Sequence, residues 1–342
     1  MKSIVYHTTG SADVMELQER AMPEPGQGEV RVRVIRSGVN PTDWKSRAGS
    51  RPGEPVPFGY QVPNQDGSGV VDELGAGVSD LAVGDRVWLW EAAWQRAEGT
   101  AQQFLCIPSR QAVRLPDDVS FDTSASLGIP ALTAHRCLTA AEVAGGKLGP
   151  GTLRGQRVLV IGGAGAVGNA AIQLARWAGA EVGAVVRDNR RAELAVAAGA
   201  NWTVNATVDD LGAAVTAKAG SVDILIDVAP VQTSAHYPTL LAPDATVSIY
   251  AFGGGETFSF PVQSHFDTNT RLQFVLVYTV PASIKDQAVN DVSNAVGSGA
   301  LAGGVSRGLP FHHFSLDQTQ QAHQAVESGI TGKVLIDVDE IA

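Results

Sequence analysis

The stretch RVLVIGGAGAVGNAAIQLARWAG, at 157–179, constrains the fold more than any other part of the chain. The apolar run RVLVI predicts a buried strand, a glycine-rich turn follows it, and the alanine-rich segment after the turn has the apolar spacing of a helix. Gly163, Gly165 and Gly168 form the pattern G-x-G-x-x-G between the two elements. A strand that passes through such a turn into a helix is typical of a βαβ unit, which belongs to a parallel sheet.

The region after Gln156 repeats this alternation of strand and helix. Apolar strands without a polar face are expected at 181–187, 202–206, 222–229 and 245–252, with alanine-rich helices at 169–179 and 191–199. This pattern is typical of a doubly wound parallel sheet with helices on both faces. Farther along, the sequence predicts a strand at 271–280, helices at 283–299 and 317–329, and a last strand at 333–338.

The first 120 residues have a different texture, with short strands divided by Gly/Pro turns. Strands are expected at 2–8, 28–39, 67–78, 84–90 and 101–108, followed by a helical segment at 115–138. The chain is therefore predicted to be α/β, with a β domain at 1–125 and a doubly wound parallel-sheet domain at 126–270.

Composition limits the partners that the protein can bind and the compartment in which it is expected. The chain has 342 residues, a formal net charge of −10 and 25 scattered basic residues, which disfavours nucleic acid and acidic membrane surfaces as partners. No run approaches about 18 apolar residues and no export signal is visible, so a cytoplasmic protein is expected. Cys106 and Cys137 are too few for a disulfide framework or a four-thiolate zinc site; free thiols are expected, and a single bridge stays open.

The glycine motif predicts dinucleotide binding. Its backbone amides, from Gly163, Ala164, Gly165, Ala166, Val167 and Gly168, would face a pyrophosphate at the helix N-terminus. The strand at 181–187 ends on Arg187, where NAD-binding proteins usually place an acidic residue, and Arg191 lies just beyond. A cation there suits a 2′-phosphate, so NADPH is predicted. Because Asp188 lies close by, NADH remains an alternative cofactor. A simpler interpretation is that the arginines are solvated side chains at the start of a helix.

With this organisation the chain resembles the medium-chain dehydrogenase/reductase superfamily, and within it the zinc-free quinone oxidoreductase (zeta-crystallin-like) branch. The resemblance rests on the order of SGVNPTDWKSRAG, NQDGSGVVDELGAGV, GDRVW, IPALTA, VLVIGGAGAVGNAAIQLA and GKVLIDV. It implies a GroES-like β domain, a Rossmann domain, and a C-terminal segment at about 270–342 that completes the first domain. It also implies an active site in a cleft between the domains and a homodimer formed through the apolar strand at 271–280.

The same resemblance implies that no metal is bound. Asn40 stands where the superfamily's zinc enzymes have a cysteine ligand, and Gln65 and Asp66 stand where those enzymes have His-Glu. The closely spaced structural cysteines are absent as well. Without a Lewis acid, an already activated acceptor such as a quinone or a conjugated carbonyl compound is the expected substrate.

The resemblance also suggests site residues. Asn40 is the leading one, because its amide would hydrogen-bond a substrate carbonyl or the cofactor ribose, although an Asn before Pro41 also forms turns. Lys45 stands where relatives carry Tyr and is either an oxyanion donor or a surface lysine. Asp43 is expected to cap a short helix, and Arg47 to be structural. Further candidates are Tyr60, Gln65 and Trp94 for the substrate pocket, and Thr133, Val228, Ala229 and Phe252 for the cofactor.

The sequence thus predicts a zinc-independent, NADPH-dependent reductase of quinones or similar conjugated carbonyl compounds. Two alternatives stay open. One is an enoyl or alkene reductase on the same scaffold; the other is a non-catalytic NADPH-binding protein like the crystallin-type relatives, since no proton donor stands out.

Overall fold

The computed structural model describes residues 1–207 and 209–339, and the chain divides into two compact units. One unit contains 1–129 and 311–342, and the other contains 130–310. The sequence places the start of the returning C-terminal segment near 270, whereas the structure places it at Phe311. The difference arises because the strand at Arg271–Phe274 and the helix at Ala282–Gly297 belong to the second unit.

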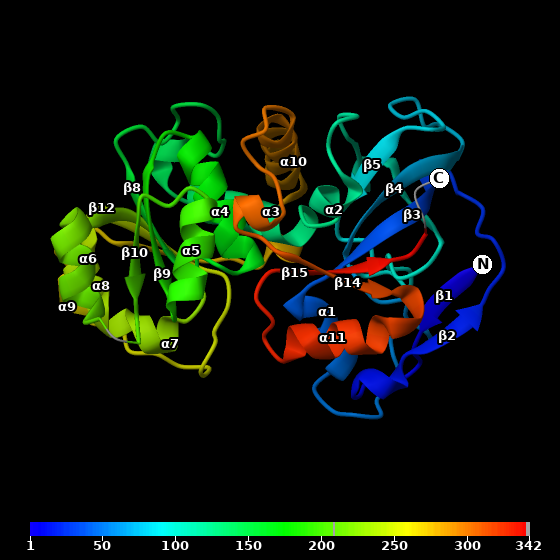
Figure 1. Ribbon diagram of the computed structural model, residues 1–342, viewed down its shortest axis with the longest axis horizontal. Helices are drawn as coiled ribbons and strands as arrows, with labels where there is room; N and C mark the ends of the chain where they lie inside the picture. The colour runs from blue at the N-terminus through cyan, green and yellow to red at the C-terminus, as the bar shows by residue number, and fades with distance from the viewer. Residues whose placement is uncertain (208, 340–342) are drawn as a thin grey trace. The chain divides into compact units, whose positions relative to one another are not determined.

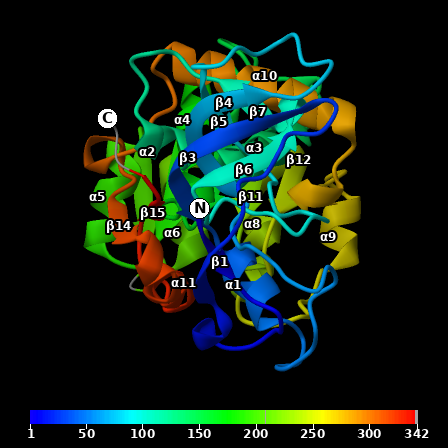
Figure 2. The same ribbon diagram turned by 90° about the vertical axis from the view of Figure 1, so that its right-hand side faces the viewer.

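The first unit is built around a largely antiparallel sheet in the order β14-β15-β3-β4-β5-β7, with β6 paired to β3. Figure 2 shows β3, β4, β5 and β6 side by side. The sheet strands are β14 (Phe311–Ser315), β15 (Lys333–Asp337), β3 (Glu29–Val39), β4 (Asp66–Leu74), β5 (Arg86–Leu89), β7 (Ala112–Arg114) and β6 (Phe104–Pro108). A separate pair is formed by β1 (Lys2–Val5) and β2 (Glu16–Glu19), and the helices are α1 (Pro41–Ala48), α2 (Phe121–Ser124) and α11 (Thr319–Glu327).

Alternation explains how β3 is half buried. Val30, Val32 and Val34 are fully buried, while Arg31 and Arg33 between them are partly exposed and pair with acidic residues. Because β3 lies between β15 and β4, its end comes next to the beginnings of both neighbours: Gly38 pairs with Asp66, and Val39 with Val334. This register gathers the polar residues described below.

The second unit is a six-stranded parallel sheet in the order β10-β9-β8-β11-β12-β13. Its strands are β10 (Trp202–Asn205), β9 (Glu181–Val186), β8 (Arg157–Ile161), β11 (Val222–Asp227), β12 (Leu241–Ile249) and β13 (Arg271–Phe274). The helices are α3 (Gly128–Thr139, which begins just before the division), α4 (Ala166–Trp177), α5 (Asn189–Ala197), α6 (Leu211–Ala219), α7 (Pro230–Thr233), α8 (Tyr237–Leu240), α9 (Val262–Phe266) and α10 (Ala282–Gly297). Figure 1 labels them, with α4 and α5 beside β8 and β9.

The direction of winding reverses at β8. Successive strands β8, β9 and β10 extend to one side, and β11, β12 and β13 extend to the other. Ligands of open parallel sheets bind outside the carboxyl ends of the strands at such a reversal. The predicted fold class, a β domain with a doubly wound parallel-sheet domain, is confirmed.

Two sequence-based elements differ from the structure. The strand expected at 271–280 ends at Phe274, because the chain turns into a 3-10 helix, Val277–Thr279, after the last pairing with Ile249. The helical segment expected at 115–138 starts only at α2, which Ser120 caps by accepting a hydrogen bond from the Thr123 amide. Within the described part of the chain, no helix has the length and apolar character needed to cross a bilayer.

Candidate functional site

Four glycines form the turn between β8 and α4, and each meets a different steric requirement. Gly162 has a φ of 79°, so the left-handed turn is made one residue before the motif predicted from sequence. A Cβ on Gly163 would lie 2.7 Å from the Ala184 Cβ, and one on Gly168 would lie 2.3 Å from the Gly162 carbonyl oxygen. Gly163 therefore lets the turn pack against β9, and Gly168 lets α4 begin close to the turn.

Gly165 has a different surrounding. It is the N-cap of α4 and exposed, and the nearest atom to a Cβ there would be the Gly162 oxygen at 3.4 Å. The amides of the first helical residues, Ala166 and Val167 among them, have no partner within the helix. An open approach to a helix N-terminus at the reversal of a parallel sheet fits a pyrophosphate. Ala164, by contrast, is buried.

The end of β9 carries the residues that would select the cofactor. Arg187 is exposed and follows β9 directly. Asp188 is the N-cap of α5: its Oδ1 accepts a hydrogen bond from the Arg191 amide at 2.8 Å, and its Oδ2 pairs with the Arg191 guanidinium. The Arg191 amide and the charges of Arg191 and Arg187 lower the pKa of Asp188. The carboxylate is thus already engaged, and Arg187 is an exposed cation at this strand end.

Two of the other cofactor candidates lie near the glycine turn. A Cβ on Gly162 would come 2.9 Å from the Val228 Cγ1, and the Gly253 amide donates to the Val228 oxygen at 3.3 Å. The loop that contains Phe252, which is 65% exposed, therefore joins the Val228 segment. The Ala229 amide donates to Asp227, whose buried carboxylate also accepts from Thr233 and Tyr237. Thr133 lies buried within α3, outside this group.

In the first unit, Asn40 joins β3 to α1 as the N-cap of the helix and is 2% exposed. Its Nδ2 donates to the Asp66 carboxylate at 2.7 Å, and its Oδ1 accepts from the Lys333 ammonium at 2.7 Å. Lys333 Nζ also lies 3.2 Å from Asp66 Oδ2. A carboxylate on one side and an ammonium on the other leave the amide one orientation, since the flipped amide would face both with the wrong atom.

Asp43 lies beside this group. Its carboxylate accepts from the amides of Asn40, at 2.6 Å, and Gln65, at 3.1 Å, so it caps α1 as expected from sequence. Burial raises the pKa of Asp43 to about 8, and the charge of Asp66 adds to this effect while the two amides and Lys333 oppose it. Burial also raises the pKa of Asp66, against the opposing effects of Lys333 and Asn40. We call Asn40, Asp43, Asp66 and Lys333 the buried polar cluster.

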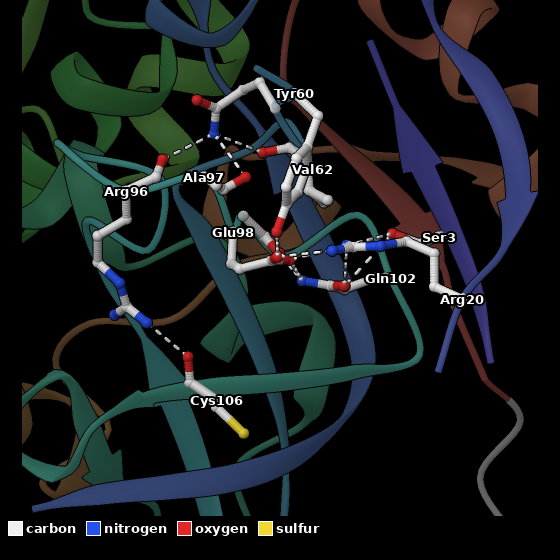
Figure 3. A network of polar contacts seen from close by, with 11 residues as sticks. Ser3, Arg20, Tyr60, Val62, Arg96, Ala97, Glu98, Gln102 and Cys106 are labelled. Atoms are coloured by element: carbon white, nitrogen blue, oxygen red, sulfur yellow. Dashed lines mark hydrogen bonds and ion pairs between the residues drawn. The ribbon is translucent and has the colours of Figure 1, made fainter. Parts of the chain in front are cut away.

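Tyr60 takes part in a different network, which Figure 3 shows from close by. Its hydroxyl donates to Glu98 Oε1 at 2.5 Å, and Arg20 binds both oxygens of Glu98 at 2.8 and 2.9 Å. The Arg20 guanidinium also stacks over the Tyr60 ring, 4.6 Å from its centroid. Gln102 completes the network by donating to Glu98. The hydroxyl predicted to line a pocket is therefore bonded to Glu98 in the loop before β6, and Arg20 links the same carboxylate to the end of β2.

Gln65 and Trp94 lie on two adjoining loops. Gln65 is buried, and its backbone oxygen and Oε1 accept hydrogen bonds from the amides of Ala92 and Ala93. Trp94 is half-buried in the second loop. Three non-glycine residues of these loops have positive φ angles: Asn64 (79°), Glu91 (50°) and Gln95 (55°). Such strain clusters at functional sites.

Lys45 and Arg47, on the same helix, differ in their environments. Lys45 is exposed, with its ammonium 5.7 Å from the centroid of the Trp44 ring. Arg47 is fully buried and pairs with Glu327 of α11 at 3.0 Å, in keeping with a structural role. His323 of α11 is also fully buried; it bonds to Asn64 at 2.9 Å, and burial lowers its pKa to about 3.

The sequence reasoning missed the roles of Asp66 and Lys333. The signal available was a lysine at the start of an apolar strand in GKVLIDV, and an aspartate at the start of the strand in NQDGSGV. Among residues 1–207 and 209–339, no group of three His, Cys, Asp or Glu side chains is arranged to hold a metal ion. The donor set of the buried polar cluster does not fit zinc, because an ammonium already bonds the Asn40 and Asp66 oxygens.

Known protein families match both units. The model of the alcohol dehydrogenase GroES-like domain matches 26–117, and that of the zinc-binding dehydrogenase family matches 166–294. The chain belongs to the medium-chain dehydrogenase/reductase superfamily. Within it, curated quinone oxidoreductases match nearly the whole chain, in line with the sequence resemblance. Mouse quinone oxidoreductase is 26% identical, with 98% of this chain and 97% of that protein covered.

Two further comparisons bear on this chain. The chloroplastic NADPH-dependent alkenal/one oxidoreductase of Arabidopsis thaliana is 30% identical, over 62% of this chain and 54% of that protein. The mycobacterial protein Rv1454c, solved in complex with NADPH, is 25% identical with a TM-score of 0.80, and 98% of this chain and 99% of that chain are covered.

Proposed function

We propose that this chain is an NADPH-dependent reductase that delivers a hydride to quinones or similar conjugated carbonyl compounds. The observation that carries the proposal is the open helix N-terminus at Gly165, at the reversal of the parallel sheet. The amides at 165–168 would hold the pyrophosphate, with Val228 and the Phe252 loop nearby. When bound, the nicotinamide supplies the hydride.

The preference for NADPH over NADH rests on Arg187 and Asp188. A free carboxylate at the end of β9 would bind a ribose 2′-hydroxyl and repel a 2′-phosphate. Here the Asp188 carboxylate caps α5 and pairs with the guanidinium of Arg191. Arg187 is therefore the residue that would bind the phosphate. The NADPH complex of the mycobacterial relative supports the same choice.

Relatives support the choice of substrate class. The mouse relative matched over nearly the whole chain is a quinone oxidoreductase, whereas the Arabidopsis alkenal/one oxidoreductase matches over a shorter span. Quinones therefore come first, and reduction of a conjugated alkene is the second candidate. Both reactions place negative charge on an oxygen, which hydrogen-bond donors stabilise.

We further propose that the reaction is zinc-independent and that Asn40 lies at the substrate end of the site. A divalent cation at Asn40 and Asp66 would be repelled by the Lys333 ammonium. One N–H of the Asn40 amide is used by Asp66, which leaves its second N–H as a donor. Gln65 and Trp94, on the strained loops, are proposed as neighbours of the substrate, and Lys45 and Tyr60 as peripheral to it.

The assembly and location of the protein are also proposals. Strand β13 is an edge of the parallel sheet, and it carries Phe274, which is 61% exposed. An edge strand with an exposed apolar side chain can pair with a second copy, so we propose a homodimer through β13. Cys106 and Cys137 are free thiols, which is the usual state of cysteines in a reducing compartment such as the cytoplasm.

Turnover with a panel of acceptors tests the substrate class. The purified protein is mixed with NADPH or NADH and with para-quinones, ortho-quinones or unsaturated ketones, and kcat/KM is measured for each. We expect the highest values for quinones with NADPH. Higher values for unsaturated ketones would favour the alkene reductase, and tight NADPH binding without turnover would favour the non-catalytic alternative.

A further inference from the structure

The side chain of Lys333 is a buried ammonium at the beginning of β15, 1% exposed. A buried ammonium is costly unless it is paired and hydrogen-bonded. Two bonds meet this need: 2.7 Å to Asn40 Oδ1 and 3.2 Å to Asp66 Oδ2. Asp66 is itself fully buried and also accepts from Asn40 and from the Ile129 amide at 2.8 Å. Every member is thus bonded to another member or to the backbone.

Two glycines make room for this ion pair. A Cβ on Gly38 would lie 2.2 Å from the Ala125 oxygen, and also 3.0 Å from the Lys333 Cε and 3.2 Å from its Nζ. A Cβ on Gly128 would lie 2.0 Å from the Asp66 Oδ1. Neither glycine has a positive φ, so space rather than backbone conformation accounts for them. A side chain at either position would therefore collide with the ion pair as well as, at Gly38, with the backbone.

The ammonium decides what the Asn40 amide can offer. Because Oδ1 faces an ammonium and Nδ2 faces a carboxylate, the amide cannot flip, and its remaining N–H is held on one side. A cation bonded to the amide oxygen also draws electron density from the nitrogen, which strengthens the N–H as a donor. Removing Lys333 would free the amide to turn and would leave Asp66 without a counter-charge.

We propose that Lys333 is a positioning residue, the resident cation of the site, which orients Asn40 and holds Asp66 where a metal ion would otherwise be needed to do so. This inference rests on the proposed function, since Asn40 acts on a substrate only if the chain is a reductase. Lys333 itself touches neither substrate nor cofactor and works through Asn40.

Rescue by a small amine tests the proposal. Lys333→Ala leaves a cavity that ethylammonium can enter, whereas the matched variant Lys285→Ala removes another buried lysine, whose ammonium donates to the Tyr278 oxygen in the second unit. For Lys333→Ala we expect kcat to fall about tenfold or more with little change in the NADPH dissociation constant, as for residues that orient a functional group. Ethylammonium should restore part of the lost kcat in Lys333→Ala and none in Lys285→Ala. An unchanged kcat, or a loss that no amine restores, would overturn the proposal.

A stability measurement separates this inference from the proposed function. Ethylammonium should raise the Tm of Lys333→Ala more than that of the wild type or of Lys285→Ala, whether or not any acceptor is reduced. If the wild type reduces no acceptor but ethylammonium raises the Tm of Lys333→Ala, the proposed function is wrong and the role of Lys333 as the resident cation is supported. If the rise is absent, the resident cation is wrong.

A second variant covers the case in which Lys333→Ala does not fold. Asp66→Asn combined with Lys333→Met removes both charges, which proteins tolerate better than the loss of one. We expect this double variant to fold, with a low kcat that ethylammonium does not restore. A kcat equal to that of the wild type would overturn the proposal.

Discussion

The carboxylate of Asp188 is held by Arg191, which donates its backbone amide to Oδ1 at 2.8 Å and pairs its guanidinium with Oδ2. In the sequence this aspartate left the choice between NADPH and NADH open. In the structure it is a helix cap with its charge matched, and we propose on this ground that it does not compete for the cofactor ribose. Arg187, one residue earlier, is the exposed cation at the strand end.

Replacing Arg187 should therefore change cofactor preference. We expect Arg187→Ala to weaken NADPH binding about tenfold, the contribution of one charge-assisted hydrogen bond, and to leave NADH binding unchanged. Arg190→Ala, an exposed neighbour in α5, is the matched control and should change neither constant. Dissociation constants from nicotinamide fluorescence check this. If Arg190→Ala has the effect instead, the phosphate contact belongs to that residue.

The packing of Gly168 predicts a second outcome. The added methyl of Gly168→Ala would lie 2.3 Å from the Gly162 oxygen, so α4 must move away from the turn. We expect a loss of about 1 to 3 kcal/mol in stability and a weaker affinity for NADPH. Gly149→Ala, whose methyl meets nothing closer than 4.0 Å, is the control and should change neither. Equal NADPH affinities of the two variants would contradict the steric account of the turn.

Asp43 predicts a pH dependence of stability. Its pKa rises from 3.8 to about 8 on folding. Between these values the folded state keeps a proton that the unfolded state has lost, so raising the pH lowers the free energy of unfolding. The contribution of one group is no steeper than about 1.4 kcal/mol per pH unit. Asp66, Lys333 and Tyr6 are the charged or titratable groups coupled to it.

Denaturant unfolding across pH 4–8 checks this prediction against Asp43→Asn. The variant should be less stable overall, since one of the two backbone amides loses its acceptor, but its stability should fall less as the pH rises. Parallel curves for the two proteins would show that Asp43 does not keep its proton in the folded state.

The edge strand β13 predicts the oligomeric state. Phe274→Lys places a charge on the exposed edge, and we expect it to convert a dimer into a monomer in light scattering. Val83→Lys, at an exposed apolar residue of the first unit, is the control and should remain a dimer. A wild type that scatters as a monomer would rule out the dimer. A Phe274→Lys variant that stays a dimer would show that the interface is not at β13.

Local patterns predicted much of this molecule. The glycine motif and the alternation of apolar strands with helices gave the parallel sheet, because both depend on residues close in sequence. The place of Asn40 at the end of a strand was also readable from SGVNPTD. Gly162 as the residue that turns was not, since two adjacent glycines offer the same freedom and only the chain geometry separates them.

Long-range partners were the part that sequence could not supply. Asn40 meets Asp66 and Lys333 across 26 and 293 residues, and this requires the register of β3 with both β4 and β15. Tyr60 shows the converse. A tyrosine in a loop reads as a pocket residue until Glu98 and Arg20, distant in sequence, are found to occupy its hydroxyl and ring.

A single-turnover experiment tests the central claim most directly. The protein loaded with an equal amount of NADPH is mixed rapidly with para-benzoquinone, and loss of the reduced nicotinamide signal is followed. We predict a first-order loss that is faster than with free NADPH and reaches a limiting rate as the quinone concentration rises. Retention of the reduced cofactor in the presence of every quinone and unsaturated ketone tried would contradict the assignment of this chain as a reductase.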